Sequence, residues 1–204
     1  AFQRECEALF LHPENLRHAA FLMLDLDNLK HTNDTYGHDY GDQYIRQTGL
    51  CFARHTPEGT LCSRISGDEF NVFFYGYDSQ DEIRTVIEQL RDEFSKKMIH
   101  LPDGQELFIS ISGGIAWYPE DASDPTTLKK YADFAMYQVK HSKKGRLGEF
   151  DLGTYNNEIY SLQSKKEFDR LIREELLYYH FQPIVSCVTG EAIAYEALMR
   201  VNLP

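Results

Sequence analysis

The feature that most limits how this chain can fold is an uninterrupted apolar run, residues 19–24, that ends in Asp25-Leu26-Asp27. An apolar run without polar alternation is typical of a strand that is buried on both faces of its sheet. Such a strand needs other elements packed on both sides. The sequence therefore predicts a layered domain whose buried strand ends at a polar site.

The patterns around this strand alternate between helices and strands. Helical spacing of apolar residues covers residues 2–11, 28–36, 42–55, 79–98 and 126–141, and apolar β-rich runs cover residues 61–65, 71–75 and 107–117. Gly67-Asp68, between two of these runs, is a hairpin signal. This order predicts an α+β domain with a central, largely antiparallel sheet flanked by helices.

The C-terminal part of the chain has a different organisation. Residues 155–177 suit a linker helix, and residues 178–185 and 191–201 are strand-like runs joined by a turn that contains Gly190. Two strands alone do not make a stable domain. We therefore predict a domain over residues 1–152, a linker helix over residues 153–177 and a two-stranded stub over residues 178–204.

Charge and composition narrow the possible partners. The formal net charge is −11, which argues against nucleic acid because phosphate neutralisation needs a basic face. No apolar run approaches the roughly 20 residues of a membrane span, so we expect no membrane contact by this chain. The four cysteines lack metal-ligand spacing and are expected to be reduced thiols of a cytoplasmic protein. Because the chain begins at Ala1 without Met, it is interpreted as a fragment of a parent that a preceding region could tether to a membrane.

Two acidic pairs lie at the ends of predicted strands. Asp25 and Asp27 follow the buried run, and Asp68 and Glu69 lie in the hairpin. Adjacent in a sheet, such carboxylates can bind Mg²⁺, which prefers hard oxygen ligands and keeps water and substrate phosphates in its shell. Taken one at a time, acidic residues at turns are more often merely solvated.

A pair of polar residues brackets Gly37. Asn33 and Asp42 could recognise the hydrogen-bonding edge of guanine, since a carboxylate accepts hydrogen bonds from N–H groups. They could equally be ordinary cap and turn residues. Spacing alone favours capping.

Cations occur near the acidic pairs and again later in the chain. Lys30 and the backbone N–H groups of Asn28 and Leu29, at the start of a predicted helix, could cradle phosphates. A later cluster of four cations could do the same, or could be a solvated helix end that the helix dipole favours. Its members are Lys140, Lys143, Lys144 and Arg146.

Together these residues resemble the signature of the GGDEF family of diguanylate cyclase domains. The resemblance rests on motifs in the family's order and spacing, at residues 24–42, 64–70, 111–116 and 132–140. Residues 66–70, Ser-Gly-Asp-Glu-Phe, stand in the place of the motif that names the family. The resemblance implies a ferredoxin-like α+β palm, similar to that of adenylyl cyclases.

The resemblance also implies an activity, the joining of two GTP molecules into cyclic di-GMP with release of pyrophosphate. It places Asp25, Asp68 and the carbonyl of Leu26 at a Mg²⁺ or Mn²⁺ ion. Glu69 would help to activate the attacking ribose hydroxyl, and Lys30 would assist at the phosphates. One domain would hold one GTP, so a working enzyme would be a homodimer. The remaining substrate-binding residues would be Asn28, Leu29, Lys140 and Lys144 at the phosphates, and Asn33 and Asp42 at guanine.

Two departures from the family's pattern bear on function. Ser66 stands where the family usually has Gly, which permits closer approach in a tight turn beside the nucleotide. Pro57 and Thr60 occupy the positions of the family's inhibitory Arg-x-x-Asp site, so product feedback there should be missing. The chain could therefore be a Mg²⁺-dependent diguanylate cyclase. Alternatively, it could be a degenerate domain that binds GTP and regulates an adjacent phosphodiesterase, or a dimerisation scaffold without nucleotide.

The C-terminal stub resembles the start of an EAL phosphodiesterase domain, at residues 181–185 and 195–200. In that family Glu196 would be a metal ligand, with Gln182 and Arg200 near the dinucleotide. The other metal carboxylates would lie beyond Pro204, so the stub is expected to be inactive. An EAL domain in the parent chain is the expected partner.

Overall fold

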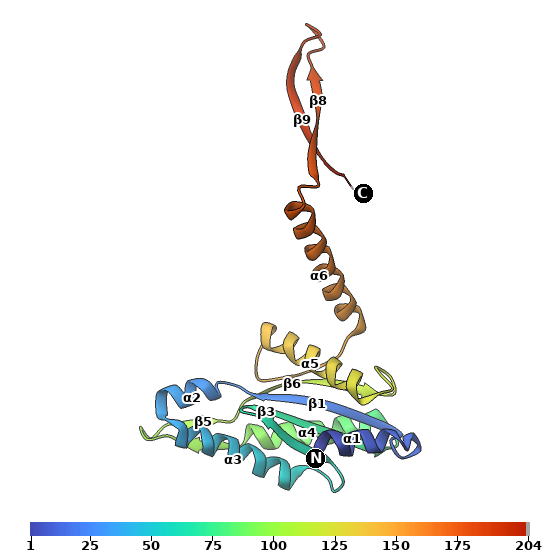
Figure 1. Ribbon diagram of the computed structural model, residues 1–204. Coiled ribbons are helices and arrows are strands. Elements are labelled where there is room, and N and C mark those ends of the chain that lie inside the picture. The colour runs from blue at the N-terminus through green and yellow to red at the C-terminus, as the bar shows by residue number, and fades with distance from the viewer. Residues whose placement is uncertain (203–204) are drawn as a thin grey trace. The chain divides into compact units, whose positions relative to one another are not determined.

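A five-stranded sheet forms the centre of the first of two compact units, Ala1–Leu152 and Gly153–Pro204, in a computed structural model that describes residues 1–202 (Figure 1). The strand order is β2-β3-β1-β6-β7; β7 is parallel to β6 and the other pairs are antiparallel. The predicted α+β fold with a mostly antiparallel sheet is confirmed. The strands are β1 (His18–Leu26), β2 (Leu61–Ser66), β3 (Glu69–Tyr77), β6 (Ile111–Tyr118) and β7 (Leu147–Glu149).

Helices cover both faces of this sheet. In Figure 1, α3 and α4 lie on one side of the sheet and α5 lies on the other. Alternate residues of β1 and β3, such as Leu22 and Val72, form the core with α3 and α4. The opposite face of the sheet packs against α5 and α1. The helices are α1 (Phe2–Phe10), α2 (Leu29–Tyr36), α3 (His38–His55), α4 (Gln80–Ser95) and α5 (Pro125–Ser142), with a 3₁₀ turn at Pro13–Asn15.

Gly114 of β6 lets α5 pack directly on the sheet. A Cβ atom at this position would lie 2.0 Å from the carbonyl oxygen of Ala132 and 2.2 Å from the backbone nitrogen of Met136. Any side chain would therefore push the helix backbone away. Close packing of α5 brings Lys140, in the last turn of the helix, to the end of β1.

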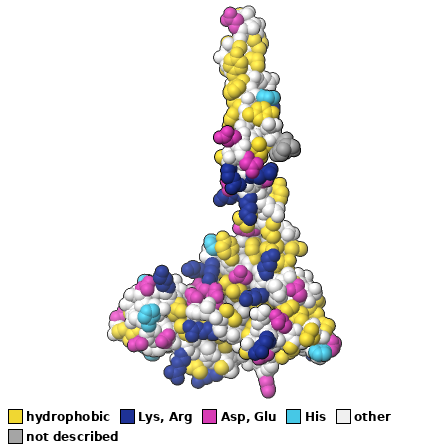
Figure 2. Space-filling view, viewed as in Figure 1, with side chains coloured by type: hydrophobic (Ala, Val, Ile, Leu, Met, Phe, Trp, Pro, Cys, Tyr) yellow, Lys and Arg dark blue, Asp and Glu magenta, His cyan; other side chains and the backbone are white. Residues whose placement is uncertain are grey.

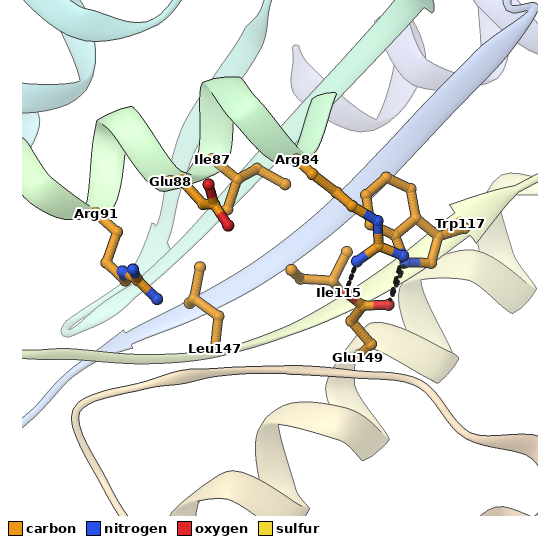
Figure 3. Close-up of a pocket in the computed structure, with 8 residues that line it drawn as sticks. All are labelled: Arg84, Ile87, Glu88, Arg91, Ile115, Trp117, Leu147 and Glu149. Carbon is orange, nitrogen blue, oxygen red and sulfur yellow. Dashed lines mark hydrogen bonds and ion pairs between the residues drawn. The ribbon is translucent and has the colours of Figure 1, made fainter. Parts of the chain in front are cut away.

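Arg84 of α4 joins that helix to β6 and β7, as Figure 3 shows. Its guanidinium lies 4.5 Å from the centre of the Trp117 ring and pairs with Glu149 through both terminal nitrogens, with Nη2 at 2.9 Å from Oε2. The Trp117 indole also donates to Oε2, at 3.1 Å. These side chains line a hollow of about 140 Å³. Since Arg84 and Glu149 neutralise each other, we interpret this cluster as a structural junction.

Two local predictions between α4 and β6 differ from the structure. The helix expected over residues 79–98 ends at Ser95, and Met98–His100 (β4) pairs with Glu106–Phe108 (β5) in a small hairpin. The run expected as one strand over residues 107–117 is divided between β5 and β6. The turn at Pro102-Asp103-Gly104 explains both differences, because it allows the flanking residues to pair locally instead of continuing a helix or a long strand. Also, α3 begins at His38, four residues before the helical pattern was expected.

The second unit contains α6 (Leu152–Arg173) from its second residue onward and a hairpin of β8 (Leu177–Val185) and β9 (Ala192–Val201). The helix ends before residue 177 because Glu175 has a left-handed backbone, with φ of 55°. The hairpin exposes large apolar side chains on both faces, among them Phe181 and Ile184. Figure 2 shows hydrophobic surface along this hairpin.

The four cysteines form no disulfide within residues 1–202: Cys6 and Cys51 are buried, and Cys62 and Cys187 are exposed. Among the helices of the described chain, none has the length and apolar character needed to cross a membrane.

Candidate functional site

The end of β1 meets the tip of the β2–β3 hairpin. The Leu26 backbone N–H donates to the Asp68 carbonyl oxygen at 2.9 Å. In the sheet register Asp25 lies opposite Glu69 of β3 and opposite Ser112 of β6. This pairing brings the two acidic pairs of the sequence to one end of the sheet, because the end of β1 lies next to the start of β3.

Asp25 is nearly buried, with 7% of its surface exposed, and its carboxylate is paired with Lys140 of α5. The Lys140 ammonium lies 2.6 Å from Oδ2 of Asp25. Burial raises the pKa of Asp25 above its usual value, and the hydrogen bond and charge of Lys140 oppose that rise. A buried carboxylate of this kind binds a cation strongly, because the cation replaces the lost solvation.

Asp27 accepts several hydrogen bonds and has a structural role, unlike Asp25. Its carboxylate accepts from the hydroxyl groups of Ser110 and Ser112, at 2.7 and 2.8 Å, and from the backbone N–H of Gly145 at 3.1 Å. The side chain is 3% exposed. These bonds fasten the loop between α5 and β7, which carries Lys144, to the end of β1.

Tyr44 of α3 completes this anchor from the opposite face of the sheet. Its hydroxyl accepts from the Ser110 backbone N–H at 2.7 Å and lies within donating distance of the carbonyl oxygens of Ser110 and Asp27. Burial raises the pKa of Tyr44 to about 12. Sequence reasoning missed the anchoring roles of Tyr44, Ser110, Ser112 and Gly145. Tyr44 and Ser110 lie outside the motifs of the sequence, and the motif at residues 111–116 gave no sign that Ser112 bonds to Asp27.

An open hollow of about 430 Å³ lies at this end of the sheet. Asn28, with φ of 62°, turns the chain from β1 into α2 so that the first residues of that helix form one wall. Acidic and basic groups face the same space, which suits an anion that is bound together with a cation. The hollow is lined by Asp25, Leu26, Asp27, Asn28, Leu29, Lys30, His31, Asp34, Asp68, Lys140 and Lys144.

Asn33 and Asp42 are not among the residues that line this hollow. Asn33 of α2 packs directly on Gly41 of α3, where a Cβ atom would lie 1.9 Å from Oδ1 of Asn33. Asp42 follows on the exposed surface of α3. Gly41 therefore makes room for Asn33, a requirement that the sequence pattern alone did not reveal.

Ser66 closes the hairpin with a hydrogen bond to Glu69. Its hydroxyl donates to Oε2 of Glu69 at 3.0 Å, and the two residues are paired across the strands. The left-handed backbone of the turn is at Gly67, with φ of 27°, while Ser66 is not among the residues with positive φ. The backbone at position 66 therefore accepts a side chain without strain.

The oxygen donors at the site fit a hard divalent cation. Within residues 1–202 no group of three or more His, Cys, Asp and Glu side chains could form a metal cluster. Asp25 and Asp68 line the hollow together with Leu26, whose carbonyl is a further oxygen donor. Mg²⁺ is commonly held by one or two carboxylates, with water and substrate phosphates as its other ligands.

Comparisons with known proteins show the family to which the first unit belongs. Residues 1–146 match the family described as "Diguanylate cyclase, GGDEF domain". The cyclic di-GMP phosphodiesterase NbdA of Pseudomonas aeruginosa is 31% identical over 202 residues, which are 97% of this chain and 25% of NbdA. The chain spans about a quarter of the length of NbdA and similar curated relatives.

Solved structures show the same fold. The GGDEF domain of TpbB (YfiN) from Pseudomonas aeruginosa superposes with a TM-score of 0.68 at 29% identity, covering 74% of this chain and 94% of that domain. The GGDEF domain of DgcB from Caulobacter crescentus, in complex with c-di-GMP, superposes with a TM-score of 0.64 at 26% identity. That match covers 73% of this chain and 88% of the DgcB domain.

Proposed function

This chain belongs to the GGDEF family of diguanylate cyclase domains, and on that basis we propose that its first unit condenses two GTP molecules into cyclic di-GMP with release of pyrophosphate. The observation that carries the proposal is the open hollow at the end of β1. Carboxylates of Asp25 and Asp68 face it together with the cations of Lys30, Lys140 and Lys144. A triphosphate bound with a divalent ion needs both kinds of group.

The metal ion, Mg²⁺ or Mn²⁺, would be held by Asp25, Asp68 and the carbonyl of Leu26, and would supply positive charge next to the phosphates. Glu69 neighbours Asp25 in the sheet register. From there its carboxylate would accept the proton of the attacking ribose 3′-hydroxyl as that oxygen bonds to the α-phosphorus of a second GTP. Pyrophosphate leaves with the electron pair of the broken P–O bond.

The substrate itself would be oriented by cations and by α2. Lys30 and Lys144 would pair with phosphate oxygens, and Lys140 would join them when it leaves Asp25. Backbone N–H groups at Asn28 and Leu29 open α2 and would add hydrogen bonds to phosphate.

Guanine would be recognised by Asn33 and Asp42, which extend from α2 and α3 beside the hollow. An amide and a carboxylate match the acceptors and donors of the guanine edge. Since one domain binds one GTP in this scheme, two copies must face each other to form both new bonds.

A second candidate function is regulation by bound GTP without turnover. Two observations favour it: Ser66 holds the Glu69 carboxylate by a hydrogen bond, and the relative NbdA is named a phosphodiesterase. In this alternative the first unit binds GTP and controls a neighbouring phosphodiesterase domain.

The β8–β9 hairpin fits the start of such a domain, the EAL domain of the parent chain. Gln182 and Glu196 are paired across the two strands, so their side chains lie side by side on one face. Arg200, four residues after Glu196, lies on that same face. A carboxylate, an amide and a guanidinium on one face suit a metal-bound phosphodiester.

The two candidates are separated by incubating the purified chain with GTP and Mg²⁺ at high protein concentration and resolving the nucleotides by chromatography. Cyclic di-GMP that disappears in Asp68→Ala would establish the cyclase. Saturable GTP binding by calorimetry without product would favour the regulatory role, provided that Ser66→Gly does not restore turnover. Absence of GTP binding would overturn both candidates.

A further inference from the structure

A second hollow, unconnected with the residues of the candidate site, lies on the α1 and α5 face of the sheet. It has a volume of about 310 Å³ and is bounded by α1, β1, β2, β3 and the first turn of α5. Its walls combine apolar side chains, among them Phe2, Phe21 and Ile65, with polar residues such as Gln3 and Thr126. Mostly apolar concave sites with a few placed polar groups are typical of small-molecule binding sites.

One buried polar side chain, Asn71 of β3, lines this hollow. The neighbours Phe70 and Val72 point into the core beneath α3 and α4, so strand alternation turns Asn71 to the opposite face. Phe73, on that same face, contacts the rings of Phe10 and Phe21. Asn71 is therefore a buried primary amide on the face of the sheet that carries these aromatic rings.

The amide of Asn71 has an unmet hydrogen-bond requirement. The side chain is 1% exposed, and within residues 1–202 no group donates to its Oδ1 atom. A buried amide oxygen is costly unless it accepts a hydrogen bond. The hollow that Asn71 lines is the route by which a donor could reach this oxygen.

The other groups of the hollow restrict what that partner can be. Burial raises the pKa of the Cys6 thiol to about 12, so this wall residue is neutral at physiological pH. The two charged residues of the lining, Glu7 and Lys129, have opposite signs, which gives no preference for a charged ligand. An engineered apolar cavity of about 150 Å³ holds benzene. A hollow twice that volume has room for two fused rings.

We propose that this hollow is a binding site for a small, uncharged bicyclic aromatic molecule whose N–H or O–H group donates to Oδ1 of Asn71. The rings would pack against Phe2, Phe21 and Ile65, where offset or edge-to-face aromatic contacts add to apolar burial. The donor group would satisfy the buried amide oxygen of Asn71, which has no partner within residues 1–202. The proposal is independent of GTP turnover, because none of these residues lines the hollow at the end of β1.

Indole and 1-methylindole test the proposal, because they share the two fused rings and only indole carries an N–H donor. Binding is followed by two-dimensional NMR of the full chain, through the Asn71 side-chain amide signals and the backbone signals of α1 and β3. We expect indole to bind about tenfold more tightly than 1-methylindole, the effect of one satisfied buried hydrogen bond. In Asn71→Leu, which keeps the branched side-chain shape and the number of its non-hydrogen atoms and removes the acceptor, the two ligands should bind equally.

Lys129→Gln is the matched control, since it changes the lining and leaves Asn71 intact, and it should keep the preference for indole. Circular dichroism checks that each variant is folded. The proposal fails if indole produces no shifts up to its solubility limit, because the Asn71 partner is then water. It also fails if the wild-type chain does not distinguish the two ligands, or if Asn71→Leu still does. GTP binding in the presence of Mg²⁺, measured by calorimetry, should be the same in Asn71→Leu and the wild type. The outcome for this hollow is therefore separate from the outcome for the proposed function.

Discussion

Lys140 has two roles in the candidate site: it pairs with a carboxylate, and it lines the hollow proposed for phosphates. Its ammonium lies 2.6 Å from Asp25, where it neutralises a nearly buried charge. The same ammonium lines the hollow that we propose for the triphosphate. A divalent ion at Asp25 would release Lys140 toward the phosphates, so the two ligands should bind more tightly together than separately.

This exchange predicts opposite effects in Lys140→Gln. Without the competing ammonium, Mn²⁺ alone should bind more tightly, by about tenfold, because Asp25 then lacks its other cation. GTP in the presence of metal should bind more weakly by a similar factor, because a phosphate contact is lost. Electron paramagnetic resonance of free Mn²⁺ and calorimetry with GTP measure the two affinities. Lys129→Gln, earlier on the same helix, should change neither, and a loss of both affinities in Lys140→Gln would contradict the exchange.

At the scale of the elements, the contact between β6 and α5 sets where Lys140 can reach. Gly114→Ala would place a Cβ atom 2.0 Å from a carbonyl oxygen of α5. We expect a loss of at least about 2 kcal/mol in the free energy of unfolding, as overpacking of a helix on a sheet produces. Chemical denaturation followed by circular dichroism measures the change.

Gly49→Ala in α3 is the matched control, because nothing lies within 4 Å of the added Cβ atom. The helix backbone there accepts alanine, so this substitution should stabilise the fold by about 0.5–1 kcal/mol. If the two alanine variants had equal stability, the close packing of α5 on Gly114 would be wrong.

The junction of α3 with the ends of β1 and β6 predicts a pH effect through Tyr44. Burial raises its pKa from 10.0 to about 12, so the unfolded chain releases this proton first. The contribution to stability is complete below pH 10 and is lost as the pH rises toward 12, by about 2–3 kcal/mol. Tyr44→Phe should be less stable at pH 7 by about 1 kcal/mol, for its lost hydrogen bonds. Near pH 12 Tyr44→Phe should be the more stable of the two proteins. Urea denaturation of both proteins at the two pH values measures this, and an equal difference in stability at both would exclude the titration of Tyr44.

Much of this arrangement could be predicted from local sequence. The buried run at residues 19–24, the hairpin signal at Gly67-Asp68 and the helical spacing before Lys140 are short-range patterns, and the sheet and its covering helices follow from them. The β4–β5 hairpin was missed because a helical pattern and a turn competed for the same residues. The bonds of Asp27 and the isolation of Asn71 could not be predicted, because both depend on which distant side chains meet after folding.

At the scale of the whole molecule, the proposed cyclase needs two copies of the chain, since each would hold a single GTP. Turnover per protein molecule should therefore rise with protein concentration at low concentration and level off once dimers dominate. An excess of Asp68→Ala, added to a fixed amount of wild type, should reduce turnover by forming mixed dimers with one complete site. Product formation by chromatography across a dilution series measures both effects. A rate per molecule that is constant on dilution would contradict the two-copy scheme.

The anchor at Asp27 has a consequence for the time course of folding. Its carboxylate joins the end of β1 to Ser110, 83 residues later, and to Gly145, 118 residues later. Contacts of such long sequence separation close large loops and tend to form late. The hollow would then be assembled in the last steps of folding, after the transition state. A nucleotide and its metal ion should consequently slow unfolding and leave the refolding rate nearly unchanged.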